Sequence, residues 1–253
     1  MLKKTKFMVF HTVQHKKISE FIPELKIGNV SIDRVKNFNF LGLTLNENLS
    51  WKPHTDLLAN KISKYTGILN RLKRYLPSHI LKTIYSSLIQ SNLNYALLAW
   101  GFNCGRLKNL QKKAIRIITN SKKYNAHTEP LMKKLNILKL EDLFKLNIIK
   151  WYFRLENKQL PSYFSNYHVQ QPSELNSLST RNNTYPVTEP QTRIQAARYC
   201  LRNHASVVVN SMPLRVIEKV YTHSYAGFSN YAKKYMISEY SEFCNIEDCY
   251  VCN

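Results

Sequence analysis

Few residues of this 253-residue chain are grouped in a way that could support catalysis. Two-metal phosphoryl transfer needs several carboxylates that converge on the same ions. None of the four aspartates has an adjacent aspartate; they are Asp33, Asp56, Asp142 and Asp248. The only acidic doublets are Glu141–Asp142, at the start of an expected helix, and Glu247–Asp248, near the end of the sequence. The pattern therefore argues against two-metal phosphoryl transfer by this chain alone.

A second group with chemical potential is the C-x4-C-x2-C pattern formed by Cys244, Cys249 and Cys252. Thiolates at short spacings bind zinc, and His223 could supply a fourth ligand. The pattern has no histidine within its loop, so free thiols are the favoured interpretation and a zinc site is the alternative.

The distribution of charge indicates a polyanionic partner. The net charge is +21, and residues 1–156 hold 28 basic side chains against nine acidic ones, whereas residues 157–253 hold nine against seven. Nucleic acid is the favoured partner, because each phosphate that a protein neutralises releases a counterion. A solvated basic surface without a partner is the alternative interpretation.

The sequence predicts neither a membrane span nor export. It contains no run of about 18 apolar residues, and its first ten residues lack an apolar stretch of signal-peptide length. We therefore expect no membrane partner and an intracellular location, in the nucleus or the cytoplasm. In those compartments the five cysteines need not form disulfides.

The first fifty residues predict short β-strands. Residues 5–10 and 38–45 are expected to be strands, and residues 25–32 a hairpin that turns at Gly28–Asn29. Fifty residues with strands this short cannot form an independent sheet with a deep core. We therefore expect this part to have completed a larger domain. His54, which follows these strands, is expected to pack or form a hydrogen bond beside Trp51.

From Lys52 onward the apolar period becomes helical. One apolar stripe predicts a helix of about five turns, and it consists of Leu58, Ile62, Tyr65, Leu69, Leu72 and Leu76. Four cations fall together on a neighbouring face of this helix: Lys61, Lys64, Arg71 and Arg74. Pro77 is expected to end the helix, and Ser78 to cap the next one.

A helix expected over residues 107–118 carries a second basic face. Its apolar stripe is opposite four cations, which are Lys108, Lys112, Lys113 and Arg116. Further helices are expected near residues 129–136 and over 140–156. A Pro- and Ser-rich linker at 157–192 and a weaker helical block at 193–240 follow. We interpret the apolar stripes as core and the basic faces as functional candidates.

Three segments resemble, in order, the reverse transcriptases of LINE-type (non-LTR, jockey-like) retrotransposons. Residues 4–10, KTKFMVF, resemble the strand that follows the catalytic aspartates of that family. Residues 35–54, VKNFNFLGLTLNENLSWKPH, resemble its primer-grip hairpin, with the aromatic-Leu-Gly core at Phe40, Leu41 and Gly42. The helical run 55–156 resembles its thumb, which holds the template–primer duplex by the backbone.

The resemblance implies an α+β fold that is mostly α. Residues 1–52 would be the remnant of a polymerase palm with a primer-grip-like hairpin, and residues 53–156 a helical thumb-like domain. Residues 157–192 would be a linker-like stretch, and residues 193–253 a helical tail. The family's Trp in the tail is replaced here by Val209, ahead of Asn210–Pro213.

The resemblance also implies a function. The chain is expected to be a fragment of an RNA-directed DNA polymerase that retains the template–primer-holding region, with Met1 just after the catalytic turn. Lys4 is a candidate supporting residue near the leaving pyrophosphate, and Phe40, Leu41, Gly42 and the two basic faces are the candidate contacts to nucleic acid. Whether the chain alone is an enzyme is left open, with an inactive chain favoured.

The expected partner is RNA or an RNA–DNA duplex, bound independently of sequence, with no small-molecule substrate bound by this fragment alone. No cofactor is expected in this chain, and Mg²⁺ only in a full-length enzyme. Two alternatives stay open. In the first, the chain would be a decayed or mispredicted transposon relic with no selected activity; in the second, it would be a domesticated nucleic-acid-binding adaptor.

Overall fold

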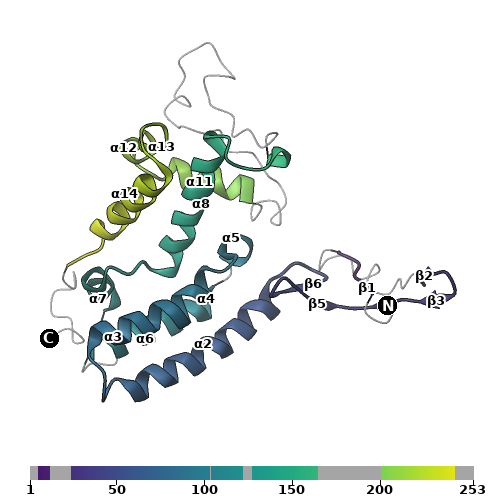
Figure 1. Ribbon diagram of the computed structural model, residues 1–253, viewed down its shortest axis with the longest axis horizontal. Helices are drawn as coiled ribbons and strands as arrows, with labels where there is room; N and C mark the ends of the chain where they lie inside the picture. Colours follow the sequence, from purple (N-terminus) through teal and green to yellow (C-terminus); the bar gives the residue numbers. More distant parts are fainter. Residues whose placement is uncertain (1–4, 12–23, 103, 122–126, 165–200, 243–253) are drawn as a thin grey trace, which may run out of the picture. The chain divides into compact units, whose positions relative to one another are not determined.

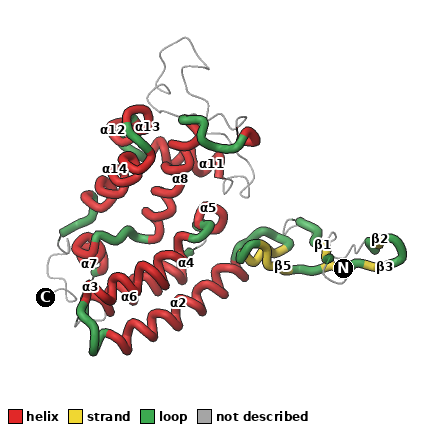
Figure 2. Tube along the Cα trace, in the orientation of Figure 1, coloured by secondary structure: helices red, strands yellow, loops and turns green. Residues whose placement is uncertain are grey.

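A computed structural model describes residues 5–11, 24–102, 104–121, 127–164 and 201–242 (Figure 1). The chain divides into two compact units, Met1–Lys64 and Tyr65–Asn253. The described residues are mostly helical, and the strands are few and short (Figure 2). This composition confirms the expected α+β class with helices dominant.

The strands of the first unit pair two by two. The pair β2 and β3 is the hairpin expected at Gly28–Asn29, and Gly28 takes a positive φ of 61° at its turn. The strands β1 and β4 run parallel, with Lys6 opposite Asp33. The strand bounds are β1 Lys6–Phe7, β2 Lys26–Ile27, β3 Val30–Ser31, β4 Asp33–Arg34, β5 Asn37–Phe40 and β6 Leu43–Asn46.

The prediction of one strand over residues 38–45 is wrong, because this segment folds back on itself. Strands β5 and β6 form an antiparallel hairpin in which Phe40 is opposite Leu43 and Phe38 is opposite Leu45. Leu41 and Gly42, between them, have φ of 49° and 79°. Two central residues at positive φ are what a two-residue type I′ turn requires. The apolar alternation continues through this turn, so the period alone could not reveal it.

The hairpin is fastened to the first turn of helix α2, Lys52–Leu72. The backbone N–H of Thr44 on β6 donates to Nδ1 of His54 over 3.4 Å, and the His54 ring meets the Trp51 ring edge-on at 6.4 Å. Burial lowers the pKa of His54, which favours the neutral ring that accepts this hydrogen bond. The expected position of His54 beside Trp51 is confirmed.

The second unit consists of helices. Three of them are close to their expected ranges, namely α6 Gly105–Ile118, α7 Thr128–Leu135 and α8 Leu140–Glu156. The shorter ones before α6 are α3 Ser78–Tyr85, the π-helical segment η2 Ser86–Gln90, α4 Ser91–Asn94 and α5 Leu97–Trp100. After α8 come η3 Ser162–Phe164, α11 Leu201–Asn210, α12 Leu214–Ile217, α13 Lys219–Thr222 and α14 Tyr225–Ser238.

Helix α8 is the centre of the second unit's core. Helices α4, α5, α6, α11 and α14 all pack against it. A helix that is apolar on nearly every side must be buried on nearly every side, and α8 follows this rule. On one side the Phe144 ring stacks on His204 of α11 at 5.4 Å, and on another Phe153 stacks on Phe228 of α14 at 5.0 Å. The helices of the expected tail therefore share a core with α8.

The segment from Ser78 to Trp100 departs from a regular helix. Ser78 is the first residue of α3 rather than its cap: Pro77 occupies the N-cap position, and no side chain caps the helix there. The π-helical turn follows at Ser86–Gln90, and Ala96 has a positive φ of 47° before α5. The period of the apolar side chains stays near helical throughout, so the sequence does not predict these irregularities.

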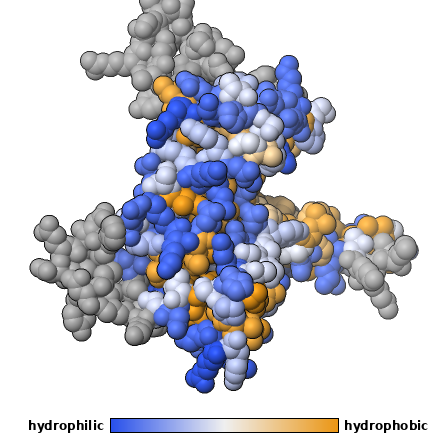
Figure 3. Space-filling view, turned by 60° about the vertical axis from the view of Figure 1, so that its left-hand side comes forward, coloured by the Kyte–Doolittle hydropathy of each residue, from blue (hydrophilic) through white to orange (hydrophobic). Residues whose placement is uncertain are grey.

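None of the helices in the described parts of the chain is long and apolar enough to cross a bilayer. Figure 3 shows one face of the molecule, on which hydrophilic residues cover much of the surface and apolar groups lie between them.

Candidate nucleic-acid interface

Helix α6 has one apolar side and one basic side. Leu107, Ala114 and Ile118 are buried. With 3.6 residues per turn, four of the five cations of α6 fall within an arc of about 120° away from that buried side; they are Arg106, Lys112, Lys113 and Arg116. The helix contains no acidic residue, so nothing on α6 itself neutralises this basic side.

Lys112 and Lys113 are the most accessible of the predicted cations on α6. Both side chains are exposed, and neither forms an ion pair with a residue that the structure describes. Arg116 lies on the same side and is half-buried. Phosphate-binding surfaces need cations that can exchange water for a phosphate oxygen. Lys112 and Lys113 meet that requirement.

Lys108 does not belong to this accessible set. Its ammonium group is bound to the carboxylate of Glu141, in the first turn of α8. This hydrogen bond is the main reason why the pKa of Lys108 is raised and that of Glu141 is lowered. The sequence groups Lys108 with Lys112 and Lys113, but in the structure its charge is paired with Glu141, a partner 33 residues away that no local pattern indicates.

A buried glutamine fixes α6 to its neighbours. The side chain of Gln111 is 2% exposed. Its Nε2 donates to the Tyr85 hydroxyl at 3.0 Å and to the Leu138 carbonyl at 2.9 Å, and its Oε1 accepts from the Leu140 N–H at 2.9 Å. Burial raises the pKa of Tyr85 to about 12. Gln111 thus joins α3, α6 and the start of α8, and it holds the basic side of α6 outward.

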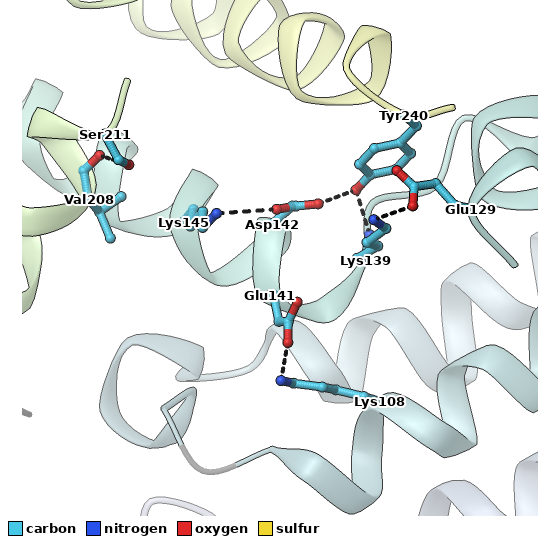
Figure 4. Close-up of polar contacts among 9 residues, drawn as sticks. All are labelled: Lys108, Glu129, Lys139, Glu141, Asp142, Lys145, Val208, Ser211 and Tyr240. Carbon is cyan, nitrogen blue, oxygen red and sulfur yellow. Dashed lines mark hydrogen bonds and ion pairs between the residues drawn. The ribbon is translucent and has the colours of Figure 1, made fainter. Parts of the chain in front are cut away.

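The first turn of α8 is a dense polar cluster (Figure 4). The side chain of Lys139, the N-cap residue of α8, makes no capping hydrogen bond. Instead, the Lys139 N–H donates to the hydroxyl of Tyr240 at 2.9 Å, and that hydroxyl donates to Asp142 at 2.5 Å. The Lys139 ammonium group pairs with Glu129 at 2.9 Å. The cap of α8 is therefore supplied by Gln111 and Tyr240, which are distant in sequence.

Replacing Tyr240 with phenylalanine is expected to lower the free energy of unfolding by about 1–2 kcal/mol, because the Lys139 N–H loses its acceptor and Asp142 its donor. Urea unfolding followed by circular dichroism measures the change. Tyr235→Phe is the matched control on α14: Tyr235 has the Arg215 guanidinium over its ring at 5.1 Å, and the variant keeps that contact. Equal losses in the two variants would contradict the capping role.

The predicted cations of the first basic face are exposed. Lys61 and Lys64 lie on the part of α2 that belongs to the first unit. Arg71 and Arg74 belong to the second unit, with Arg71 in the last turn of α2 and Arg74 just after the helix. The apolar stripe next to them is confirmed for Leu58, Ile62 and Leu69, which are buried.

The tip of the β5–β6 hairpin presents apolar side chains to solvent. Leu41 is 74% exposed and Phe40 is 55% exposed. Side chains this exposed at a turn contribute little to the core of the unit that carries them, which leaves them available for contact with another molecule. The predicted residues Phe40, Leu41 and Gly42 are brought together here, at one turn.

The segment that contains this hairpin also holds several non-glycine residues at positive φ. They are Leu41 at 49°, Leu49 at 48° and Trp51 at 58°. A left-handed conformation costs an L-residue about 1 kcal/mol or more, and such positions concentrate at functional sites. Their grouping within residues 41–51 marks this segment as a functional candidate.

Other predicted sites fall outside the described residues: Lys4 and the cysteines Cys244, Cys249 and Cys252. Within the described ranges, no group of three or more His, Cys, Asp or Glu side chains is placed to hold a metal ion.

Gln111 and Tyr240 are not among the functional residues that the sequence predicts. A lone polar residue inside an apolar stripe was the available signal for Gln111, since it stands between the stripe residues Leu107, Leu110 and Ala114. Tyr240 offered no local signal, because its partners are about one hundred residues away. Comparison with known proteins gives no further guide: no protein-family model, no curated protein and no solved structure matches this chain significantly.

Proposed function

We propose that this chain binds the sugar–phosphate backbone of RNA or of an RNA–DNA duplex without reading its sequence, as the substrate-holding region of a LINE-type reverse transcriptase. The observation that carries the proposal is the basic side of α6. It combines exposed Lys112 and Lys113 with a helix that contains no acid.

The dimensions of α6 suit a row of phosphates. From Arg106 to Arg116 the helix advances about 15 Å at 1.5 Å per residue. A DNA strand carries one phosphate for about every 3.4 Å of duplex axis, so several phosphates come within reach of this row. Lysine and arginine side chains on a rigid helix hold a backbone in position but do not by themselves read bases.

The β5–β6 hairpin supports the proposal through a different kind of contact. Phe40 and Leu41 are exposed at its tip, and aromatic side chains stack on bases of any sequence. Gly42, which has no Cβ, allows a nucleic-acid strand to approach the backbone of the turn closely. These contacts would add affinity without sequence preference, as the charge contacts of α6 do.

The proposal concerns binding rather than catalysis. The sequence contains no aspartate pair and only two acidic doublets, of which Glu141–Asp142 is engaged in the polar cluster at the start of α8. Glu141 is paired with Lys108, and Asp142 accepts a hydrogen bond from the Tyr240 hydroxyl, so both carboxylates already have partners within the fold.

The double substitution Lys112→Gln and Lys113→Gln is expected to weaken binding of a 20-base-pair RNA–DNA duplex by about tenfold at 0.1 M salt. Each lost phosphate contact also reduces the slope of log K against log salt concentration by about 0.9. Fluorescence anisotropy at several salt concentrations measures both the affinity and the slope.

The matched control is the double substitution Lys134→Gln and Lys234→Gln, which removes two exposed lysines from other helices of the same unit. It changes the net charge equally, so it corrects for long-range attraction. The proposal fails if the two variants lose the same affinity, or if the slope of the Lys112/Lys113 variant equals that of the native chain. A scrambled duplex of the same length is expected to bind equally well, whereas strong preference for one sequence would contradict backbone binding.

A further inference from the structure

A polar pocket of about 380 Å³ lies in the second unit, apart from the basic side of α6. It is formed by α3, η2 and α4 together with the end of α7 and part of α14. Seven of its eight lining residues are polar or charged and none is acidic; they are Lys82, Ser86, Gln90, Ser91, Asn94, Asn136, Ile137 and Lys233.

Two lysines from distant parts of the chain share this pocket. Lys82 comes from α3 and Lys233 from α14, and both side chains are half-buried. Neither makes a salt bridge with any residue in the described part of the chain. The pKa of Lys233 is lowered, first by burial and then by the nearby charge of Lys82. Two like charges with no counter-charge oppose each other in the folded chain, and an anion between them would remove that repulsion.

The remaining lining offers hydrogen-bond donors. The amide side chains of Gln90, Asn94 and Asn136 each carry an NH₂ group. The Oδ1 atom of Asn94 accepts from Nδ2 of Asn147 at 2.8 Å, which fixes the Asn94 amide and leaves its NH₂ group as the donor. Lysines and amide NH₂ groups are donors to oxyanions, and the lysines give charge-assisted hydrogen bonds.

The π-helical turn shapes this wall of the pocket. In it the Ser91 N–H donates to the Ser86 carbonyl, a five-residue step in place of the usual four. Such turns in otherwise α-helical segments occur frequently at functional sites. Here both ends of the turn, Ser86 and Gln90, line the pocket. Asn136, which also lines the pocket, has a positive φ of 54° at the C-cap of α7.

From these observations we infer that the pocket binds one phosphate group, held by Lys82 and Lys233 and oriented by the amides of Asn94 and Asn136. A phosphate offers several acceptor oxygens and a negative charge, and the lining offers donors and uncompensated positive charge. The phosphate is either free or the terminal group of a nucleic-acid strand. The inference does not depend on duplex binding by α6, because the two sets of lysines are different.

The first test uses inorganic phosphate on the full chain, with the side-chain amide signals of Asn94 and Asn136 followed by NMR. Saturable shifts of these signals are expected. The double substitution Lys82→Gln and Lys233→Gln should weaken binding about tenfold. The control double substitution Lys134→Gln and Lys234→Gln removes the same charge and should change binding by less than about twofold.

The second test distinguishes the two sources of phosphate. A trinucleotide with a 5′-phosphate is compared with the same trinucleotide that has a 5′-hydroxyl. If the phosphorylated form binds more tightly than both its unphosphorylated counterpart and inorganic phosphate, the ligand is a strand terminus. If inorganic phosphate binds at least as tightly, the ligand is free phosphate.

Two results would overturn the inference: no saturable shift with either phosphate probe, or equal weakening by the pocket variant and the control. The single variant Lys82→Gln keeps Lys233 and guards against a folding defect in the double variant; weaker phosphate binding is expected in it as well. The Lys112→Gln and Lys113→Gln variant should bind phosphate normally, so failure of duplex binding and failure of this pocket are separable.

Discussion

Replacing Gln111 with leucine is expected to lower the free energy of unfolding by about 3 kcal/mol. Leucine has nearly the same volume, so packing changes little, but three buried groups lose their partner at once. These are the Tyr85 hydroxyl, the Leu138 carbonyl and the Leu140 N–H. A buried polar group without a hydrogen bond costs about 1–3 kcal/mol, and the apolar leucine side chain recovers part of that cost.

Urea unfolding followed by circular dichroism measures this change, and Asn109→Ala provides the control. Asn109 lies on the same helix and is exposed, so its replacement should alter the stability by no more than about 0.5 kcal/mol. If the midpoint of urea unfolding of Gln111→Leu equals that of the native chain, the hydrogen bonds of Gln111 do not stabilise the fold.

The second large effect is expected for Gly101→Ala, which should cost about 2–3 kcal/mol. A Cβ at this position would lie 2.4 Å from Cδ2 of Phe144 and 2.7 Å from the carbonyl oxygen of Leu97. The Phe144 ring is itself packed against α11 through His204, and the carbonyl belongs to the backbone of α5. Neither neighbour can move away without disturbing a helix that packs on α8.

Gly67→Ala is the matched control for this prediction, and its expected effect has the opposite sign. A Cβ at Gly67 meets nothing within 4 Å. Glycine inside a helix is about 0.5–1 kcal/mol less stable than alanine, so Gly67→Ala should stabilise the chain by about that amount. Thermal unfolding of both variants tests the pair. A Gly101→Ala variant as stable as the native chain would show that α5 and α8 are packed less tightly than these distances indicate.

These two positions also separate stability from function. Gln111 and Gly101 fix α6 and α5 to α8, whereas Lys112 and Lys113 are exposed on α6 and contact no acid that the structure describes. The lysine variant should therefore unfold like the native chain while it binds duplex less tightly. The Gln111→Leu variant should instead be less stable than the native chain, and should bind duplex with native affinity at temperatures where it remains folded.

Much of the fold could be predicted because it follows from local periodicity. The helices α2, α6 and α8 lie where apolar side chains recur every three or four residues; most stripe residues of α6 and α8 are buried, as are Leu58, Ile62 and Leu69 of the α2 stripe. The turn at Gly28–Asn29 was predictable because the residue types that tolerate positive φ are few. The exposure of Lys112 and Lys113 followed from the same period, since they lie opposite the apolar side.

Periodicity alone does not reveal the turn at Leu41–Gly42, although the resemblance of residues 35–54 to a primer-grip hairpin implies a reversal in this segment. Leucine is an uncommon residue at positive φ, and the alternation of apolar side chains suggested one uninterrupted strand. The pairing of Phe40 with Leu43 shows where the segment reverses. A period describes a local backbone conformation and does not exclude a two-residue turn within the run.

The sequence by itself determined the class of fold, the longest helices and the excess of positive charge. Only the tertiary structure decided which charges remain available and where polar groups meet. Lys108 is neutralised by Glu141, 33 residues away, and Lys139 at the start of α8 is capped by Tyr240, 101 residues away. Lys82 and Lys233 share one pocket although they come from α3 and α14. Secondary structure depends on neighbours in sequence, whereas the ionic and hydrogen-bond partners of a side chain depend on which helices pack together.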